Sequence, residues 1–485
     1  MYAKPTTAPD RIIRGVAKPD DHVLVLFGAT GDLARRKLLP GLWHLAQTGM
    51  LPDDYRIVGA SEDAIDTGEF RRLARDAVDA HAAFTSAEGD WDAFARRMTY
   101  VAGSFGPGRT AELARAVGQA EADLGGARRL FFLAVPPVAV TSILRGLGES
   151  GLVAGARVIM EKPFGTDLAS AKALNALVHS VMDEEHVFRI DHFLGKEGIQ
   201  NVLALRFANG MFEPVWNRDH IEHIQIDIPE TLGVDDRAGF YDATGAFRDM
   251  VVTHLFQLLG FVAMEPPASM DAPDLMDAKH AVFESLRALD PAEVVRGQYA
   301  GYRALPGVAP DSDTETLVAL TAHVDNPRWD GVPVFIRTGK RMGADRKLMT
   351  IAFHEPPRSL FPFADAGARR GRQNRLTFDF DERGGIVIAF LAKRPGPVIE
   401  LERATMRFGY ESLGSGVLEA YERLFHDVMI GDKTLFTRGD GIERLWEVAA
   451  PLLATPPPAQ PYPPGGWGPE PAVQELLGPR RWLLP

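Results

Sequence analysis

The chain of 485 residues contains no cysteine. Disulfide bonds, thiol catalysis and zinc sites with cysteine ligands are therefore excluded, and this composition favours a cytoplasmic protein. No apolar run approaches the roughly 18 residues that a membrane span needs. The first twenty residues also lack the apolar core of a secretory signal. A soluble protein without contact to a membrane is the expectation.

Positive charge is scarce as well, because 53 Lys and Arg face 65 Asp and Glu, for a net charge of −12. This balance argues against nucleic acid as a partner. Neither the G-x-S-x-G elbow of hydrolases nor a P-loop lysine motif occurs. His220 and His223 form H-x-x-H, but on a strand this odd spacing directs the side chains to opposite faces, so no metal site is predicted.

What the chain does contain is an ordinary globular composition, with 46% apolar and 24% charged residues, and length for two or three domains. In the first third, strand-like and helix-like runs alternate, which predicts parallel βαβ units. Predicted strands cover 22–27, 55–61, 128–137 and 156–164, and predicted helices cover 33–47, 68–98 and 138–150. Pro40 is expected either to kink the first helix or to open a second one.

After about residue 190 the pattern changes to strands with few helices between them: 220–230, 316–324, 332–337, 347–353, 375–380 and 385–392. Such runs predict a large, mainly antiparallel sheet with one solvated or interface face, and helices over 242–263 and 412–431 are expected to cover the other face. The proline-rich stretch 456–469 is expected to pack as an extended arm or to be flexible. The predicted fold is therefore an α/β Rossmann-type coenzyme domain (1–190) followed by an α+β domain (191–485).

The turn GATGDLA follows the first predicted strand and opens the first helix. In this G-x-x-G-x-x-A variant of the dinucleotide fingerprint, glycines let backbone N–H groups approach a pyrophosphate at a helix N-terminus. The strand–turn–helix setting favours a nucleotide site built from Gly28, Ala29, Thr30, Gly31, Asp32 and Leu33.

The end of the second predicted strand bears on the choice between NAD and NADP. A 2′-phosphate calls for an arginine there, whereas a ribose 2′-hydroxyl calls for an acid. The strand ends in Glu62 and Asp63, and no basic residue occurs between Arg56 and Arg71. This favours NAD, with the alternative that both acids only cap a loop in solvent.

Further segments carry a family resemblance. EKPFG (161–165), RIDHFLGKE (189–197) and the stretch 239–265 resemble the glucose-6-phosphate dehydrogenase family, and IRTGKRM (336–342), KRPGP (393–397) and the segment 461–482 match in the same order. The resemblance runs from Val23 to Trp482. It implies a Rossmann-type domain and a β+α domain, oxidation of glucose 6-phosphate to 6-phospho-D-glucono-1,5-lactone with NADP, and a homodimer or homotetramer that associates through the sheet.

The resemblance also implies roles for individual residues. His254 corresponds to the catalytic base, which suits a histidine because its pKa lies near working pH, and Asp191 corresponds to its orienting carboxylate. His192 and Lys196 would hold the phosphate, and Lys340 and Arg346 would complete the positive cluster. The remaining implied contacts are Lys162 where coenzyme and substrate meet, Glu230 and Asp249 for sugar hydroxyls, and Pro136 for the coenzyme. On an α-helix, Asp249 and His254 would lie about 140° apart.

Three departures from the family pattern stand out. Phe193 replaces a usual tyrosine that helps to hold the phosphate, Glu62 replaces the arginine that binds NADP, and Thr253 replaces a common asparagine. The second departure predicts NAD-preferring or dual coenzyme use. Two alternatives to the main function stay open: a dehydrogenase of another aldose or aldose phosphate, and a catalytically silent homologue that acts as a partner protein.

Overall fold

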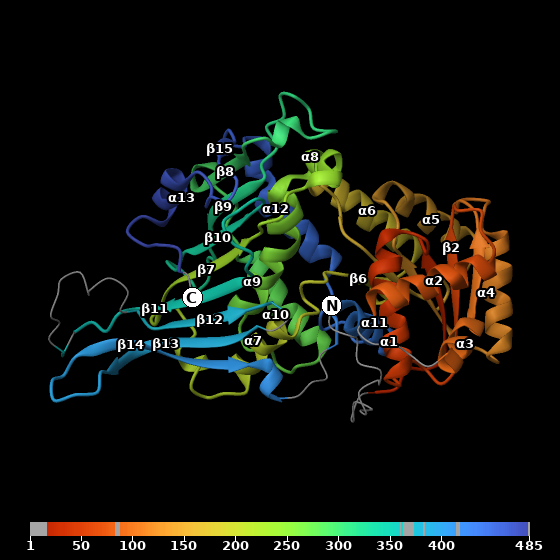
Figure 1. Cartoon of the computed structure of the whole chain (residues 1–485), viewed down its shortest axis with the longest axis horizontal. Helices are drawn as coiled ribbons and strands as arrows, with labels where there is room; N and C mark the ends of the chain where they lie inside the picture. Colours follow the sequence, from red (N-terminus) through yellow and green to blue (C-terminus); the bar gives the residue numbers. More distant parts are fainter. Residues whose placement is uncertain are drawn as a thin grey trace.

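Two β-sheets lie side by side, each flanked by helices, as Figure 1 shows. The computed structural model describes residues 17–82, 88–358, 360–361, 373–381, 384–413 and 418–483. The first sheet is built from the N-terminal part of the chain and the second from the C-terminal part, which confirms the predicted fold class.

The first sheet has six parallel strands in the order β3-β2-β1-β4-β5-β6. This is the strand order of dinucleotide-binding folds. β1 is fully buried, as expected of an apolar strand covered by helices on both faces. The strands are β1 (His22–Phe27), β2 (Tyr55–Ser61), β3 (Met98–Ala102), β4 (Arg128–Leu133), β5 (Arg157–Met160) and β6 (Val187–Arg189).

The predicted helical region over 68–98 is confirmed, but as two helices, α2 (Thr67–His81) and α3 (Glu88–Arg96), with residues 83–87 outside the described residues. The edge strand β3 that follows is missing from the prediction, because its alternating exposure gives only a weak strand pattern. Pro40 opens α1 (Leu39–Gln47) after a π-helical turn, η1 (Ala34–Leu38), so the second alternative holds. The other helices around this sheet are α4 (Ala111–Asp123), α5 (Pro137–Glu149) and α6 (Leu168–Val181).

The second sheet has nine strands in the order β14-β13-β12-β11-β7-β10-β9-β8-β15. Only the pairs β7–β10 and β8–β15 are parallel, so the sheet is mainly antiparallel as predicted. The proline-rich stretch supplies β15, which confirms the packed arm. The strands are β7 (Ile221–Pro229), β8 (Val294–Tyr299), β9 (Leu317–Ala322), β10 (Val334–Gly339), β11 (Leu348–Phe353), β12 (Arg375–Asp379), β13 (Gly385–Lys393), β14 (Leu401–Gly409) and β15 (Gln460–Tyr462).

The predicted helix over 242–263 covers one face of this sheet but is not a single α-helix. It consists of α8 (Ala238–Ala246), the π-helical η5 (Phe247–Leu255) and α9 (Phe256–Ala263). The whole run is long and apolar enough to span a membrane, contrary to the sequence expectation, but 83% of its most apolar window is buried in the protein. It is therefore a core helix. The helices α7 (Glu197–Phe207), α10 (Ala272–Glu284) and α12 (Gly439–Ala454) pack around it.

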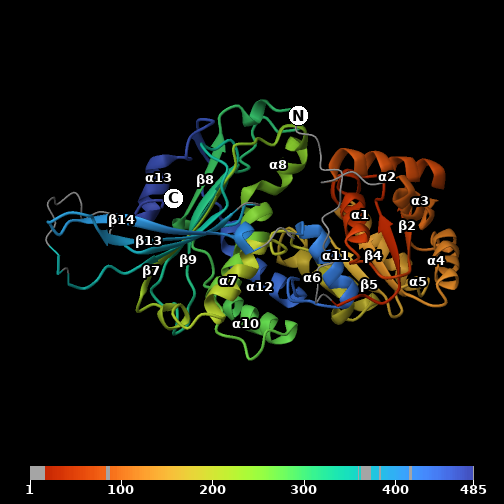
Figure 2. The same ribbon diagram turned by 60° about the horizontal axis from the view of Figure 1, so that its bottom comes forward.

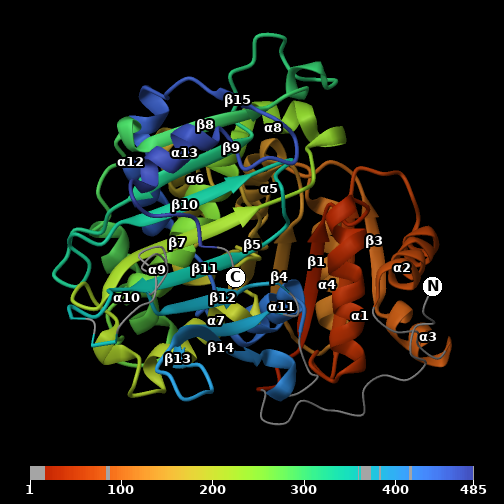
Figure 3. The ribbon, with the colours of Figure 1, turned by 60° about the vertical axis from the view of Figure 1, so that its left-hand side comes forward.

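The opposite face of the second sheet is covered in part by the C-terminal segment. In Figure 3, α13 (Glu470–Leu477) lies across β8 and β9. Gln225 of β7 donates a hydrogen bond to the carbonyl of Arg481, and the Arg337 guanidinium lies 4.2 Å from the Trp482 ring. The predicted solvated face is thus confined to other strands, above all β14, where Met406 and Phe408 are exposed.

The predicted helix over 412–431 is wrong in its length and in its place. α11 spans Ala420–Ile430 and packs on α1 of the first half instead of on the second sheet, as Figure 2 shows; residues 414–417 lie outside the described residues. Glu422 pairs with His44 at 2.7 Å, and Arg157 donates to the carbonyls of Val428 and Met429. These contacts, together with the Phe425 ring at 5.1 Å from the Phe132 ring of β4, hold α11 against the first half.

Candidate active site

The residues expected to bind coenzyme follow the carboxyl ends of neighbouring parallel strands. The glycine turn follows β1, Glu62 follows β2 and Pro136 follows β4. Lys162 and Asp191 follow β5 and β6 in the same sheet. Ligands of open α/β sheets bind at this edge, so topology alone brings together residues that are up to 163 positions apart in the sequence, from Gly28 to Asp191.

The glycine turn has the backbone shape that a nucleotide cradle needs. Gly28 has φ +73°, and a Cβ atom there would lie 2.1 Å from the carbonyl oxygen of Ala134. Its N–H donates to the Ala60 carbonyl at 2.8 Å, which fixes the turn to β2. Gly31 and Asp32 are exposed at the start of the helical segment. The turn therefore fits a dinucleotide, whose pyrophosphate is favoured at such a helix start.

Acidic and hydroxyl side chains surround the end of β2. The Thr30 hydroxyl donates to the Asp63 carboxylate and lies 2.8 Å from the Ser61 hydroxyl. Glu62 and Asp63 are both exposed, but Asp63 is also hydrogen-bonded to the glycine turn and therefore does more than cap a loop in solvent. Arg71 donates to the carbonyl of Met98. Because Met98 begins β3, this guanidinium points away from the end of β2.

A histidine and a carboxylate form a buried pair at the end of β6. His254 Nδ1 lies 2.6 Å from Asp191 Oδ1, and the two side chains are 1% and 3% exposed. Burial by itself would raise the pKa of Asp191, but the electrostatic interaction and hydrogen bond with His254, together with His192 and the backbone N–H of Phe193, keep the pKa below its usual value. An ionised Asp191 fixes the proton on Nδ1 and leaves Nε2 as the free base.

Lys162 connects this pair to Asp249. Its Nζ lies 2.7 Å from His254 Nε2 and 2.9 Å from Asp249 Oδ1. The expected 140° separation of Asp249 and His254 is wrong because η5 is π-helical, and residues five apart are neighbours in a π-helix. Burial by itself would raise the pKa of Asp249, but the charge and hydrogen bond of Lys162, together with the electrostatic effects of His254 and Lys340, hold it below its usual value.

A second group of charged residues lies where β7 and β10 end. These strands are parallel neighbours, so Glu230 and Lys340, which follow them, form an ion pair. The backbone N–H of Arg346 donates to the Pro229 carbonyl at 3.2 Å, and its Nη1 is buried without a hydrogen-bond partner among the described residues. Electrostatic coupling of Asp249 to both Lys162 and Lys340 links this group to the first.

The segment after β6 places His192 and Phe193 beside His254, and Lys196 beside Phe193. The His192 ring lies 5.1 Å from the His254 ring, and the Phe193 ring lies 5.2 Å from it. Lys196 Nζ lies 4.7 Å from the Phe193 ring and donates to the Phe380 carbonyl. Burial and the nearby His254 lower the pKa of His192 to about 3. His192 is therefore neutral and offers an N–H donor, not the positive charge that the sequence suggested.

Two family models match consecutive parts of the chain. The glucose-6-phosphate dehydrogenase NAD binding domain matches residues 25–201, and the glucose-6-phosphate dehydrogenase C-terminal domain matches residues 203–482. The chain belongs to the glucose-6-phosphate dehydrogenase family. This confirms the resemblance that the sequence motifs carry.

Similar relatives of this family are known from several bacteria. The chain is 38% identical over 486 residues to glucose-6-phosphate 1-dehydrogenase 2 of Mycobacterium bovis, covering 95% of this chain and 94% of that protein. It is 39% identical over 479 residues to glucose-6-phosphate 1-dehydrogenase of Rhizobium meliloti, covering 94% and 96%. The family likeness therefore extends over both halves of the chain.

Solved structures of the glucose-6-phosphate dehydrogenase family have the same fold. The enzyme from Mycobacterium avium superposes with a TM-score of 0.86 at 38% identity, covering 97% of this chain and 99% of that one. A glucose-6-phosphate dehydrogenase in complex with its substrate glucose 6-phosphate gives a TM-score of 0.87 at 29% identity, covering 97% and 100%.

Two contacts within this family site are missing from the sequence prediction. The Tyr421 ring of α11 stacks on the His192 ring at 6.2 Å, and Tyr421 hydrogen-bonds to Glu161. Burial raises the pKa of Glu161 to about 7, although the bond to Tyr421 and the charge of Lys162 oppose this. No local pattern marks Tyr421, which is far from the other site residues in sequence and reaches them only through the docking of α11.

Proposed function

We propose that this chain oxidises the C1 hydroxyl of glucose 6-phosphate to 6-phospho-D-glucono-1,5-lactone and transfers the hydride to NAD(P). The observation that carries this proposal is the buried pair of His254 and Asp191, which stands at the coenzyme edge of the first sheet with Lys162 beside it. Relatives that bear this enzyme name, and a solved neighbour with glucose 6-phosphate bound, support the same substrate.

His254 acts as the base in this proposal. Asp191 keeps Nδ1 protonated, so Nε2 takes the proton of the C1 hydroxyl, and the carboxylate then stabilises the imidazolium. Lys162 Nζ now donates to Nε2, so the entering hydroxyl takes this position and Lys162 turns to Asp249 or to a sugar oxygen. The coenzyme, when bound, accepts the hydride of C1 and would be held by Pro136 and by the turn over 28–33.

The remaining charged residues would bind the substrate. His192, beside the His254 ring, would supply an N–H donor for the phosphate, and Lys196, beside the Phe193 ring, would supply a cation. Glu230 and Asp249 would accept hydrogen bonds from sugar hydroxyls. Each now accepts from a lysine, Glu230 from Lys340 and Asp249 from Lys162, and these lysines would turn away as the sugar enters. Lys340 and Arg346 complete the positive cluster.

The decisive experiment follows the reduced coenzyme spectroscopically with glucose 6-phosphate or glucose as substrate. We expect turnover of glucose 6-phosphate and little or no turnover of glucose, because glucose cannot use the phosphate contacts. His254→Asn is expected to lower kcat about 10²–10⁴-fold with little change in KM. Preference for unphosphorylated glucose would favour the rival aldose dehydrogenase, and equal rates for wild type and His254→Asn would remove the proposed base.

We further infer that the coenzyme site prefers NAD or uses both coenzymes. A 2′-phosphate at the end of β2 would meet Glu62 and the Asp63 carboxylate, and like charges repel there. Arg71 is held by the Met98 carbonyl and Arg72 is exposed beside Glu69. Among the residues that the structure describes, neither of these two cations is placed to neutralise the phosphate.

Initial rates with NAD and NADP on glucose 6-phosphate test this inference. Wild type is expected to have the higher kcat/KM with NAD, and Glu62→Arg is expected to raise kcat/KM for NADP by at least about tenfold, because it replaces repulsion by a charge-assisted hydrogen bond. Asp76→Arg, at an exposed position further along α2, is the control and should change the ratio little. A strong wild-type preference for NADP would contradict the inference while leaving the proposed reaction intact.

A further inference from the structure

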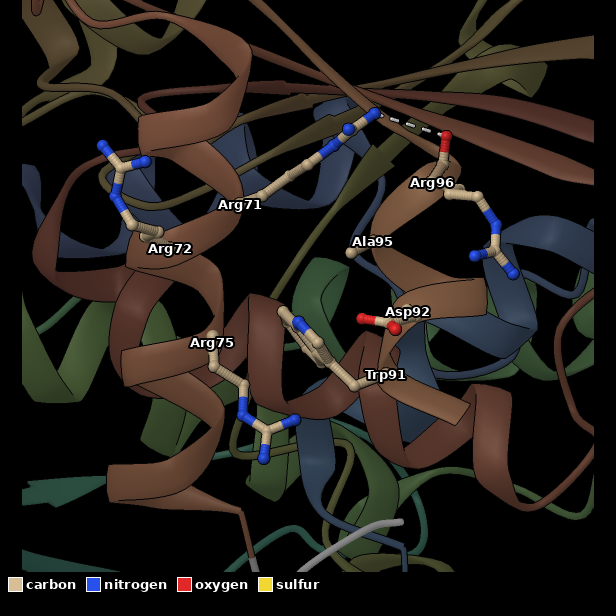
Figure 4. A pocket seen from close by; sticks show the side chains of 7 residues that line it. All are labelled: Arg71, Arg72, Arg75, Trp91, Asp92, Ala95 and Arg96. Atoms are coloured by element: carbon tan, nitrogen blue, oxygen red, sulfur yellow. Dashed lines mark hydrogen bonds between the residues drawn. The ribbon is translucent and has the colours of Figure 1, made fainter. Parts of the chain in front are cut away.

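The groove between α2 and α3, shown in Figure 4, carries four arginines but does not present them to a common point. Arg71 donates to the carbonyl of Met98, and Arg75 donates to Asp79. Arg72 points outward in Figure 4. These arginines are therefore engaged by the protein or turned away from the groove, and they do not converge on an anion.

A different cluster of contacts surrounds α11, a helix from the second half of the chain that packs on α1 of the first half. Glu422 pairs with His44 of α1 at 2.7 Å, and Glu419 pairs with Lys37 of η1 at 3.0 Å. A Cβ atom at Gly41 would lie 3.3 Å from the Glu422 side chain, so α11 approaches α1 closely. The start of α11 is thus fixed to the helical segment that follows the glycine turn.

The start of α11 also touches the segment after β6. A Cβ atom at Gly195 would lie 3.0 Å from the Cβ of Ala420, the first residue of α11, so glycine suits this close approach. The next residue, Tyr421, has its ring stacked on the His192 ring, with the centroids 6.2 Å apart and 10° between the planes. Helix α11 therefore supports the segment that carries His192 and Lys196.

The hydroxyl of Tyr421 reaches the residue that follows β5. It hydrogen-bonds to the Glu161 carboxyl, whose Oε1 is buried without a hydrogen-bond partner among the described residues. The same carboxyl interacts with the backbone N–H and the charge of Lys162. Lys162 in turn contacts His254 Nε2 and Asp249. One tyrosine side chain thus joins the segment that carries His192 to the segment that carries Lys162.

We propose, on the basis of the reaction inferred above, that Tyr421 is a positioning residue: its ring holds His192 in place for the substrate phosphate, and its hydroxyl holds Glu161 and, through it, Lys162. Tyr421 acts through these neighbours and not by contact with the reacting atoms. It is supplied by the second half of the chain, so the docking of α11 completes a site whose other parts follow strands of the first sheet.

The ring and the hydroxyl have separable effects. Stacking restricts the orientation of the His192 ring, so loss of the Tyr421 ring weakens the N–H donor offered to the phosphate and raises KM for glucose 6-phosphate. Loss of the hydroxyl removes a donor from the buried Glu161 carboxyl, which then shifts against Lys162. Because Lys162 Nζ lies 2.7 Å from His254 Nε2, its displacement lowers kcat.

Initial rates with glucose 6-phosphate test the proposal in wild type, Tyr421→Phe and Tyr421→Leu. Tyr421→Phe keeps the ring, so it should lower kcat at least about threefold and leave KM for glucose 6-phosphate within about twofold of wild type. Tyr421→Leu should lower kcat similarly and also raise KM about fivefold or more. Calorimetric binding of glucose 6-phosphate should show the same order, with Tyr421→Phe close to wild type and Tyr421→Leu weaker, independently of turnover.

Phe425→Leu, one turn later in α11, is the control. Its ring packs on Phe132 of β4 at 5.1 Å, so the variant loosens the docking of α11 without removing a contact to His192 or Glu161. It should lower the thermal midpoint and keep kcat and KM near wild type. Equal effects of Phe425→Leu and Tyr421→Leu on KM, or unchanged kcat and KM in both Tyr421 variants, would overturn the role of Tyr421. Absence of turnover in wild type would instead contradict the reaction itself.

Discussion

Phe193 is the residue at which this active site differs most plainly from its family pattern. Its buried ring lies between His254, at 5.2 Å, and the ammonium of Lys196, at 4.7 Å from the ring. A phenyl ring attracts this cation weakly and has no hydroxyl to offer a phosphate. In the proposed reaction the substrate phosphate would therefore depend more heavily on Lys196 and on the neutral His192.

Phe193→Tyr is expected to lower KM for glucose 6-phosphate. A hydrogen bond to a charged group contributes about 1.5–3 kcal/mol, which corresponds to about tenfold or more in KM. The base and its carboxylate are untouched, so kcat should change little. Initial-rate kinetics measure this, with Phe207→Tyr on α7, outside the site, as the control. An unchanged or higher KM in Phe193→Tyr would show that the position does not reach the phosphate.

The sequence motifs identify most of the proposed catalytic residues but few of the contacts between them. The motifs around Asp191, Lys162 and His254 predict three groups that meet in the structure. His254 Nδ1 lies 2.6 Å from Asp191 Oδ1, and His254 Nε2 lies 2.7 Å from Lys162 Nζ. They do not predict that Asp63 bonds to Thr30 or that Tyr421 stacks on His192. Both contacts depend on how distant segments dock, and neither leaves a local pattern in the sequence.

At the scale of elements, η5 shows how local helix geometry determines which side chains of the proposed site meet. Sequence periodicity at 100° per residue cannot distinguish an α-helix from a short π-helical segment, because the same residues remain apolar and buried. The π-helix brings Asp249 and His254 to the same lysine. Gly245, with φ +74°, separates η5 from the body of α8, and a Cβ there would lie 2.4 Å from Glu315.

The contact between α9 and α10 contains a buried lysine with an unusual proton affinity. Lys279 is 3% exposed, donates to the carbonyl of Phe436 and lies 4.8 Å from the Phe261 ring. Burial lowers its pKa from 10.5 to about 8. Above pH 8 the unfolded chain therefore binds more protons at this position than the folded protein does, so this residue makes stability rise with pH up to about 10.5.

Lys279→Met is expected to remove this pH dependence. The charged lysine opposes folding below pH 8, so the variant should be more stable than wild type at pH 7, and its advantage should shrink by about 3 kcal/mol between pH 8 and 10.5. Urea unfolding of both proteins across this range measures the difference. Lys172→Met on α6, where the lysine is 54% exposed, is the control; parallel curves for Lys279→Met and wild type would contradict the expectation.

At the scale of the whole molecule, the two halves are joined more closely than a sequential division implies. The first sheet ends with β6 at Arg189, near the predicted boundary of 190, and the family models meet between residues 201 and 203. Yet α11 packs on α1, and Trp446 of α12 donates to the carbonyl of Phe164. The domain boundary at residue 190 stays a prediction. Local periodicity contains no information on which sheet a helix late in the chain, such as α11, will join.

The exposed end of the second sheet is where this molecule is expected to meet a second copy. Met406 and Phe408 of β14 pair with Ile388 and Ile386 of β13, so their side chains share one face, and they are 56% and 37% exposed. Exposed apolar side chains gathered on a sheet face are typical of interfaces. The family resemblance implies association through this sheet, and the C-terminal segment leaves this part of it uncovered.

We therefore expect the protein to be a homodimer or homotetramer in solution, and Met406→Glu together with Phe408→Glu to yield monomers. Two carboxylates on each copy would be buried without partners if the same faces met, which costs more than the apolar contact contributes. Sedimentation equilibrium measures the mass of each form. Met211→Glu is the control, because Met211 is 72% exposed outside this sheet and its variant should keep the wild-type mass. If the double variant also keeps that mass, copies associate through another surface.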